Sequence, residues 1–250
     1  GLKKLNNKNY IERTVIKAIK NDIAIYAIHT NFDNYRFGVN DEIADRLNLK
    51  NRKILSPKSN VLSKIVFFVP HAHKAEVLNA MFAAGAGEIG EYTECSFQSE
   101  GIGTFMPSEN ATPYEGEAGE LSIVNEVRVE LLCSQYSLGA VISAMIQTHP
   151  YEEVAHDIYP IQNKNQFEGS GMIGELENEM DTLSFLKELK STFKCGVIRH
   201  TEILDKKLKR VALCGGSGSF LLEKAKSQNA DIFITSDFKY HEFFDADKQL

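Results

Sequence analysis

The sequence alternates short apolar runs with helical patterns near both of its ends, and this alternation restricts the fold more than any other feature. Residues 9–20 carry an apolar stripe at helical spacing, and the apolar run IAIYAI at residues 23–28 follows. We expect this run to form a buried strand. A second helix is expected to begin near Asn40, whose side chain can cap it. Helix and strand in this order predict an α/β unit.

A different pattern lies in the middle of the chain. From Lys64 the order becomes strand, helix, strands, helix and strand, which is typical of a ferredoxin-like α+β sandwich. Segment 97–120 is rich in Gly, Pro, Ser, Asn and Glu, so we expect a long excursion between strands. The α/β pattern then returns. We therefore predict a split α/β domain, formed by residues 1–60 and 165–250, that is interrupted by an α+β domain at residues 61–164.

Composition narrows the function classes. A chain of 250 residues can bury one large or two ordinary cores. The net charge of −6 gives no general attraction to phosphate backbones or anionic membranes, so nucleic acid is an unlikely partner. Four distant cysteines without a CxxC pair indicate reduced thiols, as in a cytoplasmic protein. No apolar stretch approaches the ~20 residues of a membrane helix.

Asp33 and His29 follow the first apolar run. In open α/β sheets, ligands bind at the carboxyl ends of the strands, because loops and helix starts meet there. Asp33 can therefore bind a divalent metal, with His29 as a second ligand or its hydrogen-bond partner. The alternative is structural: Asp33 organises the turn, and His29 packs with its ring satisfied.

Two further strand ends carry polar groups. In the glycine loop, Gly215, Gly216, Ser217 and Gly218 stand between a strand and a helix, where backbone N–H groups can bind an anion. The loop is neither a complete Walker motif nor a complete dinucleotide fingerprint, and a tight turn explains it equally well. The next predicted strand ends at Thr235, Ser236 and Asp237, and His241 follows in the first turn of a helix. All of these groups would face one edge of a single sheet.

The middle unit has its own histidines and carboxylates. The motif HPYEE begins at His149, and His156 and Asp157 follow it. Metal binding is conceivable there, but a Pro that ends a helix and an alternating strand pattern favour a structural corner. The sequence PHAH at residues 70–73 is expected to start a helix and not to bind zinc.

Four stretches in order resemble one known family. They are IYAIHTNFD…GVND, GIGTFMPSENATPYEGEAGE, HPYEEVAHDIYPI and VALCGGSGSFLLEKAKSQNADIFITSDFKYHEFFDA. Together they resemble the GTP cyclohydrolase 1 type 2 homologue family, also called the NGG-interacting-factor family, in its long bacterial form. The resemblance covers essentially the whole chain. It implies a split α/β metal domain, an inserted domain similar to PII and CutA proteins, and a toroidal homohexamer with two divalent metal ions per subunit.

Only one family metal ligand maps onto this sequence, at Asp33. The other ligands, a His-His pair and a later His and Glu, would lie before Gly1 and after Leu250, so we expect a chain truncated at both ends. Zinc, iron and manganese suit such ligands about equally. The metal identity therefore stays open.

The family name implies hydrolytic opening of a guanine ring. His29 or His241 would then transfer protons, and the glycine loop would contact a phosphate. We therefore expect a metal-dependent hydrolase that acts on a nucleotide or another small molecule. The alternative is a ring-shaped, non-enzymatic regulatory protein that senses a ligand through its PII-like domain, with segment 97–120 as the working part.

Overall fold

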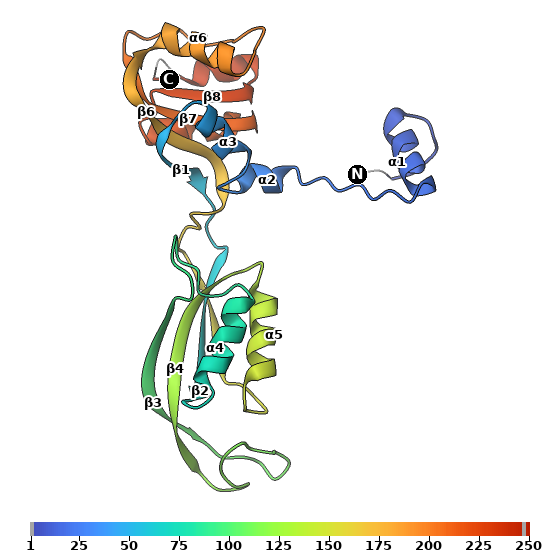
Figure 1. Cartoon of the computed structure of the whole chain (residues 1–250), viewed down its shortest axis with the longest axis vertical. Coiled ribbons are helices and arrows are strands. Elements are labelled where there is room, and N and C mark those ends of the chain that lie inside the picture. The colour runs from blue at the N-terminus through green and yellow to red at the C-terminus, as the bar shows by residue number, and fades with distance from the viewer. Residues whose placement is uncertain (1–2, 247–248) are drawn as a thin grey trace.

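The computed structural model describes residues 3–246 and 249–250, and within them the strands form two four-stranded sheets, one above the other in Figure 1. The upper sheet has the strand order β1-β6-β7-β8. Strand β6 is antiparallel to β1 and to β7, whereas β7 and β8 are parallel. Its strands are β1 (Lys50–Pro57), β6 (Gly169–Asp181), β7 (Lys207–Ser217) and β8 (Ile232–Asp237). The helices around it are α2 (Thr30–Asn34), α3 (Val39–Arg46), α6 (Thr182–Thr192), η1 (Ser219–Leu221), α7 (Leu222–Ser227) and η2 (Tyr240–Ala246).

Distant parts of the sequence build this upper sheet. Strand β1 comes from the first part of the chain, and Ile54 of β1 stands opposite Met172 of β6. Apolar residues alternate between the two faces, so that Leu213 packs with Phe185 of α6 while Ala212 packs with Leu221 and the α7 side. The predicted split α/β unit is confirmed. The two faces of the sheet bury separate apolar clusters.

The lower sheet has the order β3-β4-β2-β5, and its neighbouring strands are all antiparallel. Its elements are β2 (Leu62–Pro70), α4 (Lys74–Ala83), β3 (Ser96–Phe105), β4 (Ser122–Ser134), α5 (Leu138–Thr148) and β5 (His156–Ile161). Both helices cover the same face (Figure 1), where Phe67, Met81, Val129 and Met145 form the core. This is the predicted ferredoxin-like arrangement.

The predicted excursion at 97–120 is shorter in the structure. Its first part is strand β3, which pairs with β4 from Ser96 to Phe105, so the loop itself spans residues 106–121. The glycines inside β3 made this segment resemble a loop in the sequence. The pairing between β3 and β4 nevertheless accommodates them. At Gly103 the space of a side chain is taken by the carboxylate of Glu126 on β4.

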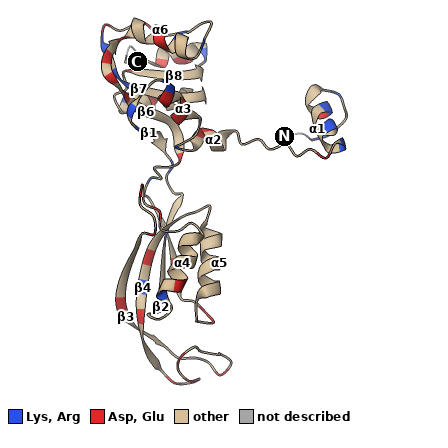
Figure 2. Ribbon diagram, in the orientation of Figure 1, with Lys and Arg blue, Asp and Glu red and all other residues tan. Residues whose placement is uncertain are grey.

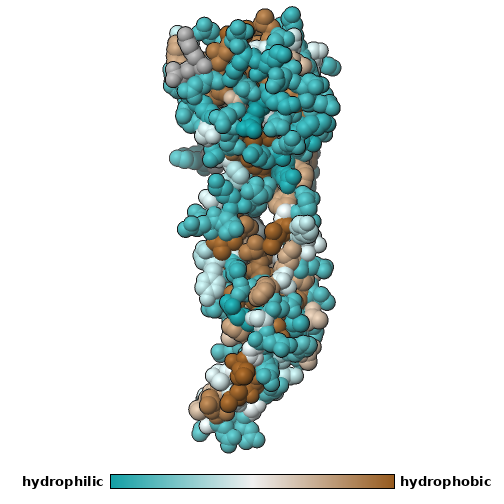
Figure 3. Space-filling view, turned by 90° about the vertical axis from the view of Figure 1, so that its left-hand side faces the viewer, coloured by the Kyte–Doolittle hydropathy of each residue, from teal (hydrophilic) through white to brown (hydrophobic). Residues whose placement is uncertain are grey.

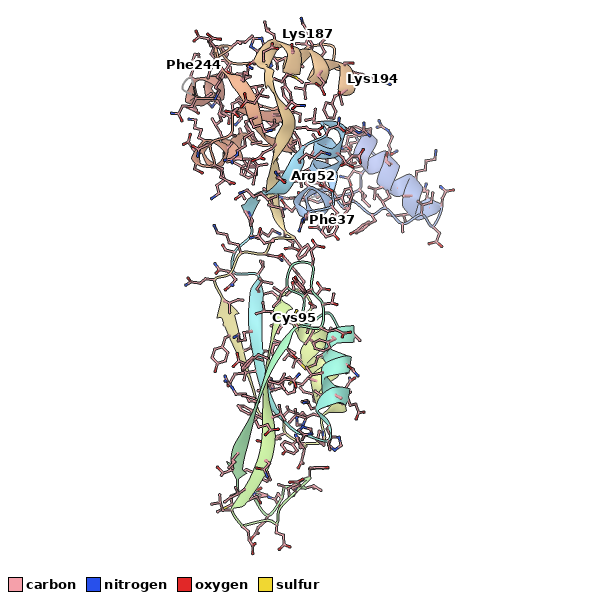
Figure 4. All side chains as sticks on the ribbon, turned by 60° about the vertical axis from the view of Figure 1, so that its left-hand side comes forward. Phe37, Arg52, Cys95, Lys187, Lys194 and Phe244 are labelled. Atoms are coloured by element: carbon pink, nitrogen blue, oxygen red, sulfur yellow. The ribbon has the colours of Figure 1, made fainter. Side chains whose placement is uncertain are left out.

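The chain crosses twice between the sheets, and the two crossings lie side by side. The amide of Lys58 donates to the carbonyl of Glu168 at 2.8 Å, and the amide of Asn165 donates to the carbonyl of Lys58 at 2.8 Å. Phe37, labelled in Figure 4 above this junction, has its ring 6.4 Å from that of Phe167. The junctions at 60/61 and 164/165 stay predictions, although the crossings lie close to them.

The first helix, α1 (Tyr10–Lys20), forms as predicted but stands apart from both sheets at the end of an extended segment (Figure 1). Asn9 caps it by accepting a 2.9 Å hydrogen bond from the amide of Glu12. The prediction of a buried strand at 23–28 is wrong for this structure, because the run has no strand conformation and every residue in it is exposed. No described strand lies where it could pair.

Two predicted helix details also differ. Helix α3 begins at Val39 with Gly38 as its N-cap, and the side chain of Asn40 is buried instead of capping the helix. The reason is steric: a side chain at position 38 would collide with the carbonyl oxygen of Phe32. The C-terminal helix predicted after β8 is a 3₁₀ helix, η2. Of the helices in the described part, none combines the length and apolarity that crossing a membrane requires.

Candidate functional site

Asp33 lies in the short helix α2, half-buried, at the carboxyl end of β7. The side chain of Asn40 holds it there. Asn40 Nδ2 donates to the main-chain oxygen of Asp33 at 2.7 Å, and Asn40 Oδ1 accepts from the amide of Gly215 at 2.8 Å. Asn40 is only 3% exposed. One buried side-chain amide thus connects the Asp33 turn to the glycine loop. This agrees with the prediction that the two face the same edge of one sheet.

The thiol of Cys214 lies beside the Asn40 bridge, next to Gly215 in the chain. Burial raises the pKa of the Cys214 thiol, and the negative charge of Asp33 raises it further. Cys214 is the residue before Gly215, near the end of β7. The raised pKa favours the protonated thiol over the reactive thiolate.

The glycine loop is fastened to β8 by hydroxyl groups. The amide of Gly218 donates to Thr235 Oγ1 at 3.0 Å, and the Thr235 and Ser236 hydroxyls donate to the carbonyl of Gly216 at 2.8 and 2.9 Å. Gly216 has a φ of +72°, a conformation that favours glycine. Two of the loop amides, those of Gly215 and Gly218, therefore donate within the protein. This supports the tight-turn interpretation, and anion binding by Gly215, Gly216, Ser217 and Gly218 stays a prediction.

The remaining predicted site residues are exposed. His29 has its Nδ1 2.8 Å from Thr30 Oγ1, and His241 lies on η2 next to Glu242. Glu242 accepts from the amide of Lys239 at 2.7 Å and from the Ser219 hydroxyl at 2.9 Å. The Lys239 amide is the main reason why the pKa of Glu242 lies below its ordinary value. His29 contacts Asp33 through the backbone alone, since the Asp33 amide donates to the His29 carbonyl at 3.4 Å while the His29 ring contacts Thr30.

Sequence reasoning missed Asn40 and Glu242 as parts of this region. Asn40 was assigned a capping role because it precedes two acidic residues, which is the usual signal of an N-cap. No local sequence pattern pointed to Glu242, because its hydrogen-bond partner Ser219 is 23 positions away in the chain.

The described residues do not form a complete metal site. Among residues 3–246 and 249–250, no group of three or more His, Cys, Asp or Glu side chains is arranged to hold a metal ion. At the β7 end, Asp33 offers one carboxylate. Asp33 is therefore one ligand of an incomplete donor set among the described residues, and no reaction step through a metal follows from it.

Two histidines of the lower sheet, His149 and His73, make structural contacts. His149 Nε2 lies 2.9 Å from the carbonyl of Phe68, and its Nδ1 accepts from the amide of Tyr151 at 3.1 Å. This pattern requires a neutral ring with its proton on Nε2. His73 contacts the Tyr114 hydroxyl at 3.0 Å and stacks edge-on against its ring, which fastens the 106–121 loop to the start of α4. The predicted structural corner at HPYEE is present.

Known proteins are similar to this chain along its whole length. A family model described as Duf34/NIF3 (NGG1p interacting factor 3) matches residues 1–250. A Bacillus subtilis protein named GTP cyclohydrolase 1 type 2 homolog is 41% identical over 247 residues, which cover 98% of this chain and 66% of that protein. A Listeria monocytogenes protein of the same name is 39% identical over 231 residues, or 92% of this chain and 62% of that protein. The chain thus spans slightly less than two thirds of the length of these relatives.

Solved structures give the same result. The crystal structure of a Bacillus cereus protein related to NIF3 superposes with a TM-score of 0.83 at 41% identity, covering 100% of this chain and 66% of that one. A Staphylococcus aureus protein superposes with a TM-score of 0.66 at 29% identity, covering 98% of this chain and 64% of that one. Both share the two-sheet arrangement described above.

Proposed function

Because this chain belongs to the Duf34/NIF3 family, we propose that it is part of a metal-dependent hydrolase to which it contributes the carboxylate of Asp33 as a metal ligand. The observation that supports this role is the Asn40 bridge, which fixes the Asp33 turn against the glycine loop at the carboxyl end of β7. Loops at such strand ends form the ligand sites of open α/β sheets. The Asp33 carboxylate is half-buried, and Asn40 holds the main chain of Asp33 in place. The carboxylate is therefore already positioned to bind a cation.

Further ligands are needed beside Asp33, since the described residues supply no cluster of three. His29 and His241 are exposed near the same sheet edge and are assigned to proton transfer in this proposal. The first substrate class to test is the nucleotides, because relatives carry the name GTP cyclohydrolase 1 type 2 homolog. The metal can be zinc, iron or manganese, and two ions per subunit are expected.

Metal content tests the proposal directly. Inductively coupled plasma mass spectrometry would be applied to the purified protein and to its Asp33→Asn variant, with GTP hydrolysis measured in parallel. The control is Asp22→Asn, which removes the same charge from an exposed position on the other side of residues 23–28. We expect bound metal and turnover in the protein and in the control, and a sharp loss of both in Asp33→Asn. Equal metal in all three, or none in any, would refute Asp33 as a ligand.

We also propose that the chain assembles with copies of itself into a ring-shaped homohexamer. Strand β3 is an edge strand, and large apolar side chains are exposed on it and on its neighbour, namely Phe97, Ile102 and Ile123. Figure 3 shows apolar residues gathered near the end of the molecule that points away from the upper sheet. Exposed apolar strands at a sheet edge favour pairing with another chain.

Acidic and basic residues are interspersed along the ribbon in Figure 2, so nucleic acid is not part of the proposal.

The alternative function, a ligand-sensing regulatory protein, has one observation in its favour. The 106–121 loop is fastened at two places, by Tyr114 to His73 and by the amide of Thr112 to Glu152 at 2.9 Å. An ordered loop at the end of a ferredoxin-like sheet is suited to respond to a ligand. Under this alternative, Tyr114→Phe would change nucleotide-induced thermal stabilisation while Asp33→Asn would not.

A further inference from the structure

The 106–121 loop lies at the end of the lower sheet that points away from the upper sheet (Figure 1). Every residue of the loop is described, and among them Pro107 alone is buried. The loop therefore has almost no apolar core of its own, and its position depends on contacts with neighbouring elements. Segments with so few buried contacts open at a low cost in free energy.

Two of these contacts come from the corner that follows α5, which we define as residues 149–152. The carboxylate of Glu152 accepts a 2.9 Å hydrogen bond from the amide of Thr112. The ring of Tyr151 lies against that of Tyr114, with 6.0 Å between the ring centroids. Two consecutive residues of the corner thus hold two positions of the loop.

The corner is held in turn by the ring of His149, which is only 8% exposed. Its Nε2 lies 2.9 Å from the carbonyl of Phe68, and a carbonyl can only accept, so Nε2 carries the proton. Its Nδ1 is then the acceptor of the 3.1 Å hydrogen bond from the amide of Tyr151. The two rings also pack edge-on, with 4.9 Å between their centroids. The conformation of the corner therefore requires a neutral His149.

A second proton on His149 is incompatible with this corner. The proton would bind at Nδ1, so two N–H groups would face each other where the hydrogen bond from Tyr151 now lies. The charged ring would have to turn away, and the peptide groups of Tyr151 and Glu152 would move with it. Burial lowers the pKa of His149, so the closed corner resists that proton. Below pH 6.5, the ordinary pKa of histidine, protonation favours an opened corner.

His73 faces His149 from the start of α4. A positive charge on His73 disfavours one on His149. Its own contact with the loop joins Nε2 to the Tyr114 hydroxyl at 3.0 Å. A hydroxyl group both donates and accepts, so this contact is possible whether His73 is neutral or charged. The acid-sensitive contact is therefore the one at His149.

Carboxyl and hydroxyl groups also face the corner. Burial raises the pKa of Tyr151, and Glu126 on β4 raises it further, followed by Glu115 and Tyr114 of the loop. Tyr151 therefore stays neutral in mild acid. Carboxyl groups ordinarily take up their protons at about pH 4, so the range from pH 7.5 to pH 5.5 isolates the response of histidines.

We propose that the 106–121 loop is a pH-sensitive element, which is fastened to the corner while His149 is neutral and released when His149 takes up a proton. The change passes through the peptide of Tyr151 to Glu152, which then loses the amide of Thr112. Release uncovers the ring of Tyr151 at the end of the lower sheet. The element is independent of the metal site proposed in the upper sheet.

Hydrogen exchange measured by mass spectrometry on the whole protein tests this inference, after correction for the intrinsic pH dependence of exchange. Between pH 7.5 and pH 5.5, protection of the 106–121 loop should fall by up to about tenfold, because each pH unit below the ordinary pKa contributes up to a factor of ten. In His149→Gln the fall should be absent, since a glutamine side chain can donate to Phe68 and accept from Tyr151 but carries no charge.

The matched control is His156→Gln. It removes another histidine of the lower sheet, whose Nδ1 lies 2.8 Å from the carbonyl of Val154, and should keep the full response of the loop. Unchanged loop protection at pH 5.5 in the wild-type protein would overturn the proposal, as would the same fall in His149→Gln. An equal loss of protection in β2 and β4 would also overturn it, because the whole sheet and not the loop would then open.

If His149→Gln does not fold, nuclear magnetic resonance of the wild-type protein decides the question. The ring protons of His149 and the amide of Thr112 should then shift with a common midpoint below pH 6.5. Separate midpoints would show that the loop does not follow His149 and would refute the proposal.

Discussion

Asn40 donates a 2.7 Å hydrogen bond to the main-chain oxygen of Asp33, seven residues earlier in the chain. The other end of the same side chain accepts from Gly215, 175 residues later. A single buried amide therefore connects the first and last parts of the sequence. Both of its partners are main-chain groups, so the bridge does not use the Asp33 side chain and leaves the Asp33 carboxylate available.

Replacement of Asn40 by Ala should destabilise the upper sheet. The change leaves the Asp33 oxygen and the Gly215 amide without their partner, and each buried orphan costs about 1–3 kcal/mol. Urea unfolding measures the loss of stability: the midpoint concentration of urea should fall while the dependence of the unfolding free energy on urea stays the same. Asn34→Ala is the control, since Asn34 makes one partly buried hydrogen bond, to Ser170. A loss in Asn40→Ala no larger than in the control would show that the bridge is energetically unimportant.

Two glycines of the same loop should respond differently to Ala. At Gly216 a methyl group would meet open space, so the cost is the positive φ alone, about 1–2 kcal/mol. At Gly218 it would come within 2.6 Å of Cys214 Cβ and 2.7 Å of Thr235 Oγ1. Overpacking there adds about 1–3 kcal/mol and forces the loop away from β8. In thermal unfolding, the melting temperature of Gly218→Ala should be lower than that of Gly216→Ala. The reverse order would contradict this geometry.

His149 should make the lower sheet sensitive to mild acid. Burial lowers the pKa of His149, although its hydrogen bond to Phe68 opposes the shift. In mild acid the His149 ring therefore binds a proton more readily in the unfolded chain than in the folded one. The stability of the fold falls as the pH drops below 6.5, the ordinary pKa of histidine. The unfolding free energy of the protein should decrease between pH 7.5 and pH 5.5, and His149→Gln should decrease less. Parallel pH profiles for the two proteins would exclude His149 as the cause.

The two sheets have separate apolar cores and should lose protection separately. Met145→Ala in the lower core should cost about 2–5 kcal/mol and Phe185→Ala in the upper core about 3–5 kcal/mol. Hydrogen exchange should show faster opening in β2 and β4 for the first variant and in β6 and β7 for the second. If either variant loosens both sheets equally, the chain folds as one cooperative unit and the predicted domain bounds are wrong.

Much of the secondary structure was predictable because it depends on local patterning. The stripe of α1, the strand of β2 and the helix of α5 follow from apolar spacing alone. The ferredoxin-like order of the lower sheet followed from element order. Its inner strand β2, which lies between β4 and β5, is apolar from Ile65 to Pro70. Strand β3 was missed as a strand because its glycines and polar residues resemble a loop.

The candidate site was predictable only in part. Asp33, the glycine loop and the Thr235–Ser236 pair were each visible, since each follows an apolar strand pattern. Their connection was not visible, because the Asn40 bridge and the Ser219–Glu242 hydrogen bond join residues that are adjacent only after folding. The sequence also could not show that the side chains of His29 and His241 would lie exposed.

By itself, the sequence determined which segments can be helices and strands, because backbone propensity and apolar periodicity act over a few residues. The tertiary structure alone decided where the run at 23–28 lies, how Asn40 is used and which loop amides are occupied. These depend on contacts between distant residues, and the same apolar run is a strand only if an open edge is within its reach.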